Sequence, residues 1–225
     1  MNVTWLGQAG LLFDFDGVSV LVDPYLSNSV YKIQPHNYRR VEVDESFLKI
    51  RPDIIVLTHN HLDHTDPETL KHYLGVDTSV TVLASFNAWN SVRNAFGGIN
   101  NNYVSFNRGT VWTEKGIKFE AVYAEHSDQY AIGVLITYKD KVYYVTGDTL
   151  LSKKIFEDLP SNVDYVFLPV NGKGNNMNMV DAKNFCDKIG CIAIPIHCGL
   201  FDDLDFNDFL YDKKIIPTIY KKINL

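Results

Sequence analysis

Thr58-His-Asn-His-Leu-Asp-His64 places three histidines and one aspartate within six residues, directly after the apolar run Ile54-Ile-Val-Leu57. Side chains alternate along an extended chain, so His59 and His61 point the same way and can bind one ion. Asp63 and His64 follow where the chain can turn, and they can reach a second ion. Imidazole and carboxylate are the usual ligands of catalytic zinc and similar divalent ions. A chance cluster on a polar loop is the alternative, but the whole chain holds 7 histidines, which makes this pattern an improbable accident.

Four more ligand-type residues stand directly after apolar runs: Asp23, His126, Asp148 and His197. Strand ends converge on one rim of a sheet, so residues that are far apart in the sequence can meet there. Taken singly, each histidine could be a hydrogen-bonded structural residue, and each aspartate could form a turn or cap a helix. Because a metal-binding cluster at residues 59–64 would need further ligands, we interpret these four residues as functional. The remaining histidines, His36 and His72, are expected on the surface.

Hydrophobic patterning predicts strands in both halves of the chain, each time followed by alternating strands and helices. A hairpin turn is expected at Asp16-Gly17, and Thr65 or Asp66 can cap a helix that begins near Pro67. Two sheets packed face to face with helices outside would accommodate this order. The predicted strands are 3–6, 10–15, 18–22, 54–58, 80–84, 111–112, 117–124, 132–138, 142–146, 163–168 and 192–196, and the predicted helices are about 66–74, 88–96, 152–158 and 180–189.

Composition is that of an ordinary globular protein, with 46% hydrophobic and 21% charged residues. We expect a single domain over residues 1–225, since no linker or low-complexity tract divides the chain. The net charge of −6 disfavours a nucleic-acid partner. We see no signal peptide and no membrane span. Three cysteines without a metal-finger spacing fit a reducing cytoplasm, and Cys198, which adjoins His197, is expected in the core.

The ligand set resembles that of the metallo-β-lactamase superfamily, whose five metal-binding motifs all have a match here in order. His61 stands where the di-iron, oxygen-reducing branch has glutamate, so the chain looks like the hydrolytic branch. Within the superfamily it is most similar to the ascorbate-6-phosphate lactonase-like group, although it is much shorter than the lactonase. The supporting segments are Trp5-Leu-Gly-Gln-Ala-Gly10, Val22-Asp-Pro24, Gly147-Asp-Thr149, Leu168-Pro-Val-Asn-Gly-Lys173, Met177-Asn-Met-Val-Asp-Ala182 and Pro195-Ile-His197. The resemblance implies an α/β fold, a four-layer αββα sandwich of two mixed sheets.

The resemblance also implies a dinuclear centre in which Asp148 bridges two metal ions. One ion would be held by His59, His61 and His126, and the other by Asp63, His64 and His197. Two such ions can share a water and lower its pKa, and the resulting hydroxide is the nucleophile. We expect Asp63, Asp148 and His197 to be catalytic, with Asp63 orienting the attacking water. Zinc is the default for a histidine-rich site, and manganese or iron is compatible with it.

We expect a small anionic substrate with an ester, lactone or phosphoester bond, such as a sugar-phosphate lactone. Two ions and Lys173 would make the site locally positive. Asp23, Asn171 and Lys173 are expected to contact the substrate, beneath a rim formed by segment 24–40. The alternatives are a phosphodiesterase acting on nucleotides or short RNA, and a non-catalytic metal-binding protein. An amidohydrolase barrel would need eight strand–helix repeats, which this chain lacks room for. We expect no membrane partner, and the sequence is compatible with a homo-oligomer.

Overall fold

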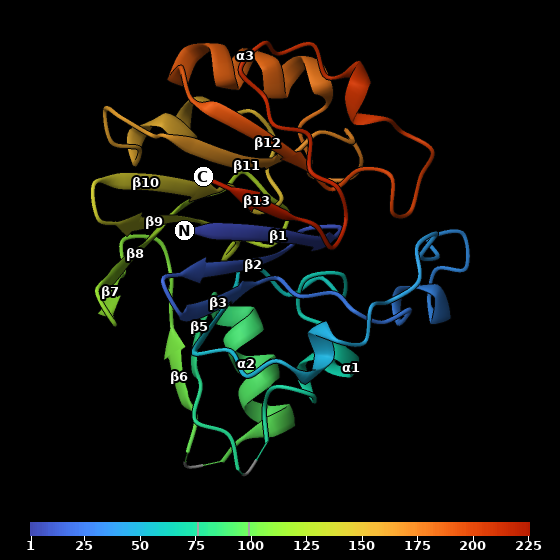
Figure 1. Cartoon of the computed structure of the whole chain (residues 1–225), viewed down its shortest axis with the longest axis vertical. Helices are drawn as coiled ribbons and strands as arrows, with labels where there is room; N and C mark the ends of the chain where they lie inside the picture. The colour runs from blue at the N-terminus through green and yellow to red at the C-terminus, as the bar shows by residue number, and fades with distance from the viewer. Residues whose placement is uncertain (76, 99) are drawn as a thin grey trace. The chain divides into compact units, whose positions relative to one another are not determined.

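The computed structural model describes residues 1–75, 77–98 and 100–225 (Figure 1). It divides into two compact units, each built on one mixed β-sheet. The first unit comprises residues Met1–Phe106, Leu200–Asp202 and Thr218–Leu225, and the second comprises Asn107–Gly199 and Asp203–Pro217. Two mixed sheets with few helices confirm the predicted α/β class. No helix in the described ranges is both long and apolar enough to cross a membrane.

The first unit carries a seven-stranded sheet in the order β13-β1-β2-β3-β4-β5-β6. β13, β1, β2 and β3 are antiparallel, and β3, β4, β5 and β6 are parallel. At the β2–β3 hairpin, Asp16 and Gly17 both have positive φ, as the predicted turn requires. The strands are β1 (Asn2–Gly7), β2 (Gly10–Phe15), β3 (Val18–Val22), β4 (Ile54–Leu57), β5 (Thr81–Ala84), β6 (Asn102–Ser105) and β13 (Lys222–Asn224).

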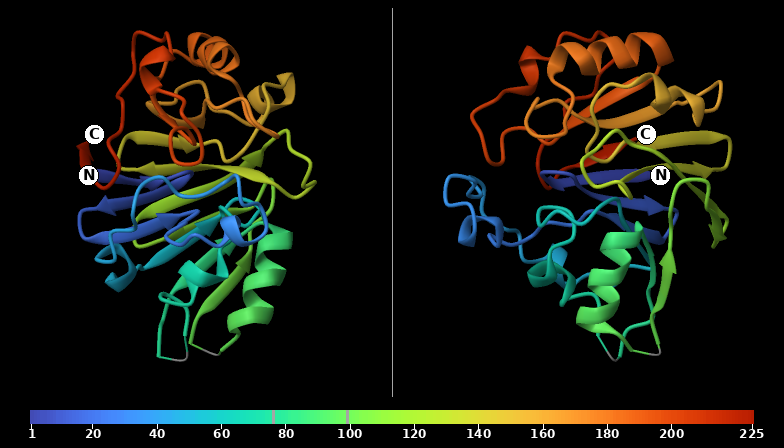
Figure 2. Two further views of the ribbon diagram at one scale, coloured as in Figure 1. Left: turned by 90° about the vertical axis from the view of Figure 1, so that its right-hand side faces the viewer. Right: turned by 180° about the vertical axis from the view of Figure 1, so that it is seen from behind.

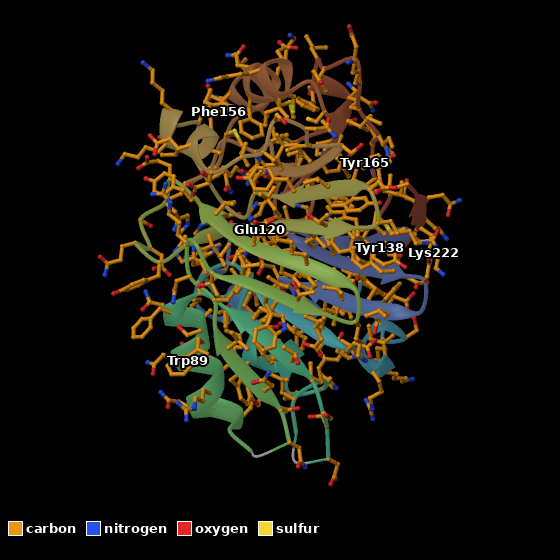
Figure 3. All side chains as sticks on the ribbon, turned by 90° about the vertical axis from the view of Figure 1, so that its left-hand side faces the viewer. Trp89, Glu120, Tyr138, Phe156, Tyr165 and Lys222 are labelled. Atoms are coloured by element: carbon orange, nitrogen blue, oxygen red, sulfur yellow. The ribbon has the colours of Figure 1, made fainter. Side chains whose placement is uncertain are left out.

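Helix α2 (Phe86–Phe96) packs on β5 and β6, as Figure 1 shows. It presents Ala88 and Val92 to the core, where they join Ile55 and Leu57 of β4. Trp89, labelled in Figure 3, lies partly buried on this helix, and its indole N–H donates to the carbonyl of Tyr103 at 3.1 Å. All four residues of β4 are buried, as expected of a central strand covered on both faces. This burial anchors the segment that carries the histidine cluster.

The second unit carries a six-stranded sheet in the order β12-β11-β10-β9-β8-β7. β10, β11 and β12 are parallel, and the remaining pairs are antiparallel. Helix α3 (Met179–Ile189) packs on β11, and Figure 2 shows this helix in orange. Asn178 caps its N-terminus, and Gly190 ends it in the left-handed region. The strands are β7 (Val111–Glu114), β8 (Ile117–Tyr123), β9 (Ile132–Tyr138), β10 (Lys141–Val145), β11 (Tyr165–Pro169) and β12 (Ile192–Ile196).

Every predicted strand is present within a few residues, and two further strands, β6 and β13, were not predicted. β6 reads Asn-Tyr-Val-Ser and β13 reads Lys-Ile-Asn, so neither shows an apolar run, and both lie at an edge of their sheet. Helix α1 (Pro67–Leu70) ends four residues earlier than predicted, in turns. The predicted helix 152–158 is a 3-10 helix, η3 (Lys153–Glu157). Further 3-10 turns are η1 (Val30–Lys32), η2 (Phe47–Lys49) and η4 (Phe206–Asp208).

Candidate metal centre

The first group of candidate ligands lies in the first unit, on the segment between β4 and α1. A tight turn gathers the imidazoles, because the N–H groups of His64 and Thr65 both donate to the carbonyl of His61. The ring of His59 lies 4.5 Å from that of His61 and 4.0 Å from that of His64, centroid to centroid. His64 Nε2 lies 3.9 Å from Asp63 Oδ2. His59 and His64 are buried and His61 is exposed, so the group reaches from the core to the surface.

Asp66 fixes the end of this segment. Its carboxylate accepts the N–H groups of Glu68 and Thr69, both at 3.1 Å, and Pro67 follows it at the first helical position. The hydroxyl of Thr65 donates back to the carbonyl of His59 at 2.7 Å. Asp66 is therefore the residue that caps the helix, and Thr65 closes the turn. The short helix starts where the sequence predicted it, and this start positions the cluster.

Asp23 orients His64. It follows β3 with a φ of 43°, and it is 1% exposed. One carboxylate oxygen accepts the N–H of Thr58 at 2.8 Å, and the other accepts its hydroxyl at 2.5 Å and lies 2.7 Å from His64 Nδ1. A carboxylate on one ring nitrogen leaves the other nitrogen as the metal ligand. We expected Asp23 at the substrate, but the structure buries its carboxylate against Thr58 and His64.

Gln8 is a site residue that the sequence analysis missed. Its amide Nε2 donates to Asp63 Oδ2 at 3.0 Å, and the residue is 3% exposed with a φ of 49°. The indole of Trp5 donates to its carbonyl at 2.9 Å, which fixes the turn between β1 and β2. Gln8 stands within the segment Trp5–Gly10 that contributed to the resemblance, which was the available signal. Its amide holds one oxygen of Asp63 in place.

The second group of candidate ligands lies in the second unit, where β8, β10 and β12 end. The ligand atoms of His126 and Asp148 lie within 4.8 Å of each other, and His197 Nε2 lies 3.3 Å from Asp148 Oδ1. Asp148 is 7% exposed and His197 is 5% exposed. The main-chain N–H of Asp128 donates to His126 Nδ1 at 2.9 Å, which fixes that ring. The strand ends thus bring together three side chains, of which the first and last are 71 positions apart in the sequence.

The loop after β11 packs two asparagine side chains against the ring of His197. Asn171 and Asn176 each place their amide Nδ2 near His197 Nδ1, at 3.1 and 3.4 Å. Lys173 is exposed, and its main-chain N–H donates to Asn171 Oδ1 at 3.2 Å. Gly172 has a φ of 65°, and a Cβ there would lie 2.8 Å from Asn178 Cβ, so this position needs glycine. Asn171, expected at the substrate, has its amide against a ligand-type histidine.

Segment 24–40 is divided between core and surface. Tyr25 is fully buried, and the guanidinium of Arg39 donates to its carbonyl at 2.7 Å. Burial lowers the pKa of Arg39, and it raises the pKa of the Tyr25 phenol. Tyr31 and Tyr38 are 47% and 45% exposed. In Figure 2 the segment appears as a light-blue loop beyond β3. His36 and His72 are exposed as predicted, and Cys198 is buried as predicted.

The donor set suits divalent transition metals. In each unit the candidate ligands combine imidazoles with a carboxylate, which is Asp63 in the first unit and Asp148 in the second. Imidazole favours zinc and iron, and carboxylates extend the choice to manganese. The partners described above are of the kind that orient metal ligands, namely a carboxylate on His64 and an amide on Asp63. These residues therefore fit metal ions of this class.

The family model of the beta-lactamase superfamily domain matches residues 2–197 of the chain. A UPF0173 metal-dependent hydrolase of Ligilactobacillus salivarius is 29% identical over 94% of this chain and 92% of its own length. Two solved structures share the fold. A Veillonella parvula protein described as a possible metal-dependent hydrolase has a TM-score of 0.81 at 17% identity, covering 100% of this chain and 99% of that one. Igni18, a metallo hydrolase of Ignicoccus hospitalis, has a TM-score of 0.74 at 19% identity, covering 99% and 97%.

The family match spans both units and includes every candidate ligand from His59 to His197. It therefore agrees with the ligand pattern and with the two mixed sheets. On these grounds the chain belongs to the metallo-β-lactamase superfamily.

Proposed function

We propose that the chain acts as one domain and is a metal-dependent hydrolase with two divalent ions. His59, His61 and His126 would hold the first ion, Asp63, His64 and His197 would hold the second, and Asp148 would be a ligand shared by both. The observation that carries this proposal is the carboxylate of Asp148, which has a ligand atom within 4.8 Å of that of His126 and an oxygen 3.3 Å from His197 Nε2. A relative named a metal-dependent hydrolase supports the activity. Zinc is our first choice of metal, with manganese and iron as alternatives.

Such ions, when bound, lower the pKa of water and polarise a carbonyl or phosphoryl oxygen. The chain's own residues then orient the attacking water and the metal ligands. Asp63 is 18% exposed, so one carboxylate oxygen can face the attacking water while Gln8 holds the other. Asp23 holds His64 in the orientation that presents Nε2. Neither a serine nor a cysteine nucleophile is required, and the three cysteines are buried.

The substrate we propose is a small anion with an ester, lactone or phosphoester bond, a sugar-phosphate lactone being one example. Lys173 supports this choice, since it is an exposed cation on the loop whose Asn171 contacts His197. The net charge of −6 disfavours a polyanion. A phosphodiesterase for nucleotides or short RNA and a non-catalytic metal-binding protein are the alternatives. The free, buried thiols fit a reducing compartment such as the cytoplasm.

The test combines metal content with a hydrolysis panel. We expect about two metal equivalents per chain after expression with zinc or manganese, measured by elemental analysis. The panel contains lactones, phosphomonoesters, phosphodiesters, short RNA and β-lactams, and we expect the small anionic compounds to be preferred. Asp148→Ala should abolish hydrolysis while circular dichroism stays unchanged, because the bridging carboxylate is lost. Zero metal would contradict the function, and a preference for RNA would contradict the substrate class.

A further inference from the structure

A small pocket lies in the first unit, between the segment that carries the histidine cluster and helix α2. Figures 1 and 2 show α2 beside α1, the helix that follows this segment. The volume of the pocket is about 210 Å³. Leu70 and Val92 are 0% and 1% exposed and form its deep end, whereas Asn60 and Ala95 are exposed and lie at its mouth. The pocket is therefore open to solvent and has an apolar interior.

The lining of this pocket suits a small, neutral molecule with an apolar body. An apolar cavity of about 150 Å³ can hold benzene, so this pocket has room for one aromatic ring. Among the described residues that line it, none is charged, and an unpaired charge would be costly to bury there. The side chains of Asn60 and Ser91 can hydrogen-bond one polar group of the occupant.

The pocket shares a wall with the segment of candidate metal ligands but contains none of those ligands. Asn60 and Leu62, which alternate with candidate ligands in the sequence, both line the pocket. Thr65 lines it as well, and its hydroxyl donates to the carbonyl of His59 at 2.7 Å. A molecule in the pocket would therefore touch this segment without taking the place of a metal ion.

One turn decides where the candidate ligands on this segment lie. The main-chain N–H groups of His64 and Thr65 both donate to the carbonyl of His61. A molecule packed against Leu62 and Thr65 restricts this turn, since it fills the space on one side of it. A metal ion restricts the same turn through its ligands. Two ligands that stabilise the same arrangement bind with positive coupling.

We propose that this pocket binds a small, neutral, apolar molecule and that its occupant strengthens metal binding. The pocket is then an effector site, because its occupant acts on the metal ions through the turn and not by contact with them. The coupling rests on the proposed metal-binding function, whereas the binding of the small molecule does not.

The first test is binding to the metal-free full chain, followed by two-dimensional nitrogen-15 NMR. Benzyl alcohol is the probe, and benzoate is a charged molecule of similar size. We expect benzyl alcohol to bind with a Kd of about 1 mM or below, and to shift the main-chain signals of Leu62, Thr65 and Val92. We expect benzoate to leave these signals in place. Shifts that lie only elsewhere on the chain would overturn the assignment of the site.

The second test fills the pocket. Ala95→Phe places a large side chain at its mouth, at an exposed position of α2. Asn94→Phe is the matched control, because Asn94 is exposed on the same helix and does not line the pocket. We expect Ala95→Phe to weaken the binding of benzyl alcohol roughly tenfold or more, and the control to bind as the wild type does. Ser91→Leu is a second filling variant, which decides the matter if Ala95→Phe does not fold.

The third test measures the coupling. Zinc is titrated into the metal-free chain against a chromophoric chelator, with and without saturating benzyl alcohol. We expect benzyl alcohol to lower the Kd of at least one zinc equivalent roughly fivefold. Zinc must then lower the Kd of benzyl alcohol by the same factor, because the coupling of two binding equilibria is reciprocal. In Ala95→Phe the zinc affinity should not depend on benzyl alcohol.

The outcomes separate this inference from the proposed function. A wild type that binds benzyl alcohol but no zinc overturns the proposed function and the coupling, and it leaves the pocket confirmed. A wild type that binds zinc but not benzyl alcohol overturns this inference alone. The same holds if Ala95→Phe binds benzyl alcohol as well as the wild type does, or if benzyl alcohol leaves the zinc affinity unchanged.

Discussion

Gln8 carries the clearest prediction at the scale of a single residue. Its Nε2 donates to Asp63 Oδ2, so Gln8→Ala should let that carboxylate rotate away from the attacking water. We expect kcat/KM to fall roughly 10–100-fold with little change in secondary structure. Gln34→Ala is the matched control, since Gln34 is exposed and contacts Asn37. Steady-state kinetics on the best substrate would contradict the role if Gln8→Ala and Gln34→Ala behave alike.

Two buried tyrosines make a second comparison at this scale. The hydroxyl of Tyr144 is buried without a hydrogen-bond partner in the described residues, and burial raises its pKa. The hydroxyl of Tyr73 donates to the carbonyl of Phe47 at 2.8 Å. We expect Tyr73→Phe to lower the free energy of unfolding by about 1 kcal/mol, while Tyr144→Phe leaves it unchanged or raises it. Urea unfolding measures both, and equal losses would contradict the prediction.

At the scale of elements, Asp158 joins η3 to β8 and to the chain before β7. It accepts two N–H groups of Arg108, at 2.7 and 2.8 Å, and the main-chain N–H of Tyr123 at 2.8 Å. The Arg108 guanidinium holds the pKa of this carboxyl below its ordinary value of 3.8. Because the folded protein binds the proton less readily than the unfolded chain, this stabilisation is present above pH 3.8 and is lost as pH falls through the lower, folded value.

The Asp158→Asn variant tests this connection. At neutral pH we expect its free energy of unfolding to be about 2 kcal/mol below that of the wild type, as for a hydrogen bond to a charged group. The difference should shrink as the pH falls below about 4, where Asp158 itself takes up a proton. Asp212→Asn removes an exposed carboxylate and serves as the control. A difference that stays constant down to acid pH would show that the carboxylate charge plays no part.

At the scale of the whole molecule, the proposed metal binding should stabilise the folded chain. Candidate ligands lie in each of the two units, and the family match runs through both. We expect zinc at about 1,000 times its Kd to stabilise the folded chain by about 4 kcal/mol. Differential scanning calorimetry should show one transition that moves upward with zinc and downward with a chelator. Two transitions, only one of which moves with zinc, would contradict the single-domain expectation. In Asp148→Ala the transition temperature should rise less on addition of zinc than in the wild type.

Local pattern was sufficient for much of the fold. The alternation of apolar runs and turns placed the central strands, since burial of an apolar run depends on the run itself. It failed at β6 and β13, where an edge strand needs few apolar residues. It also predicted too long a helix at α1. The apolar residues Tyr73 and Leu74 are buried, but they lie beyond the end of the helix at Leu70.

The sequence by itself determined the candidate ligands, because His59 to His64 are adjacent in the chain and the others follow strong apolar strands. The tertiary structure alone decided what holds them. Gln8 meets Asp63 across 55 residues, and Asp23 meets His64 across 41. Each polar side chain has many candidate partners in the sequence. Which of them it reaches depends on the register of β1, β3 and β4 in the sheet, and a buried hydrogen bond forms only where that register brings donor and acceptor within about 3 Å.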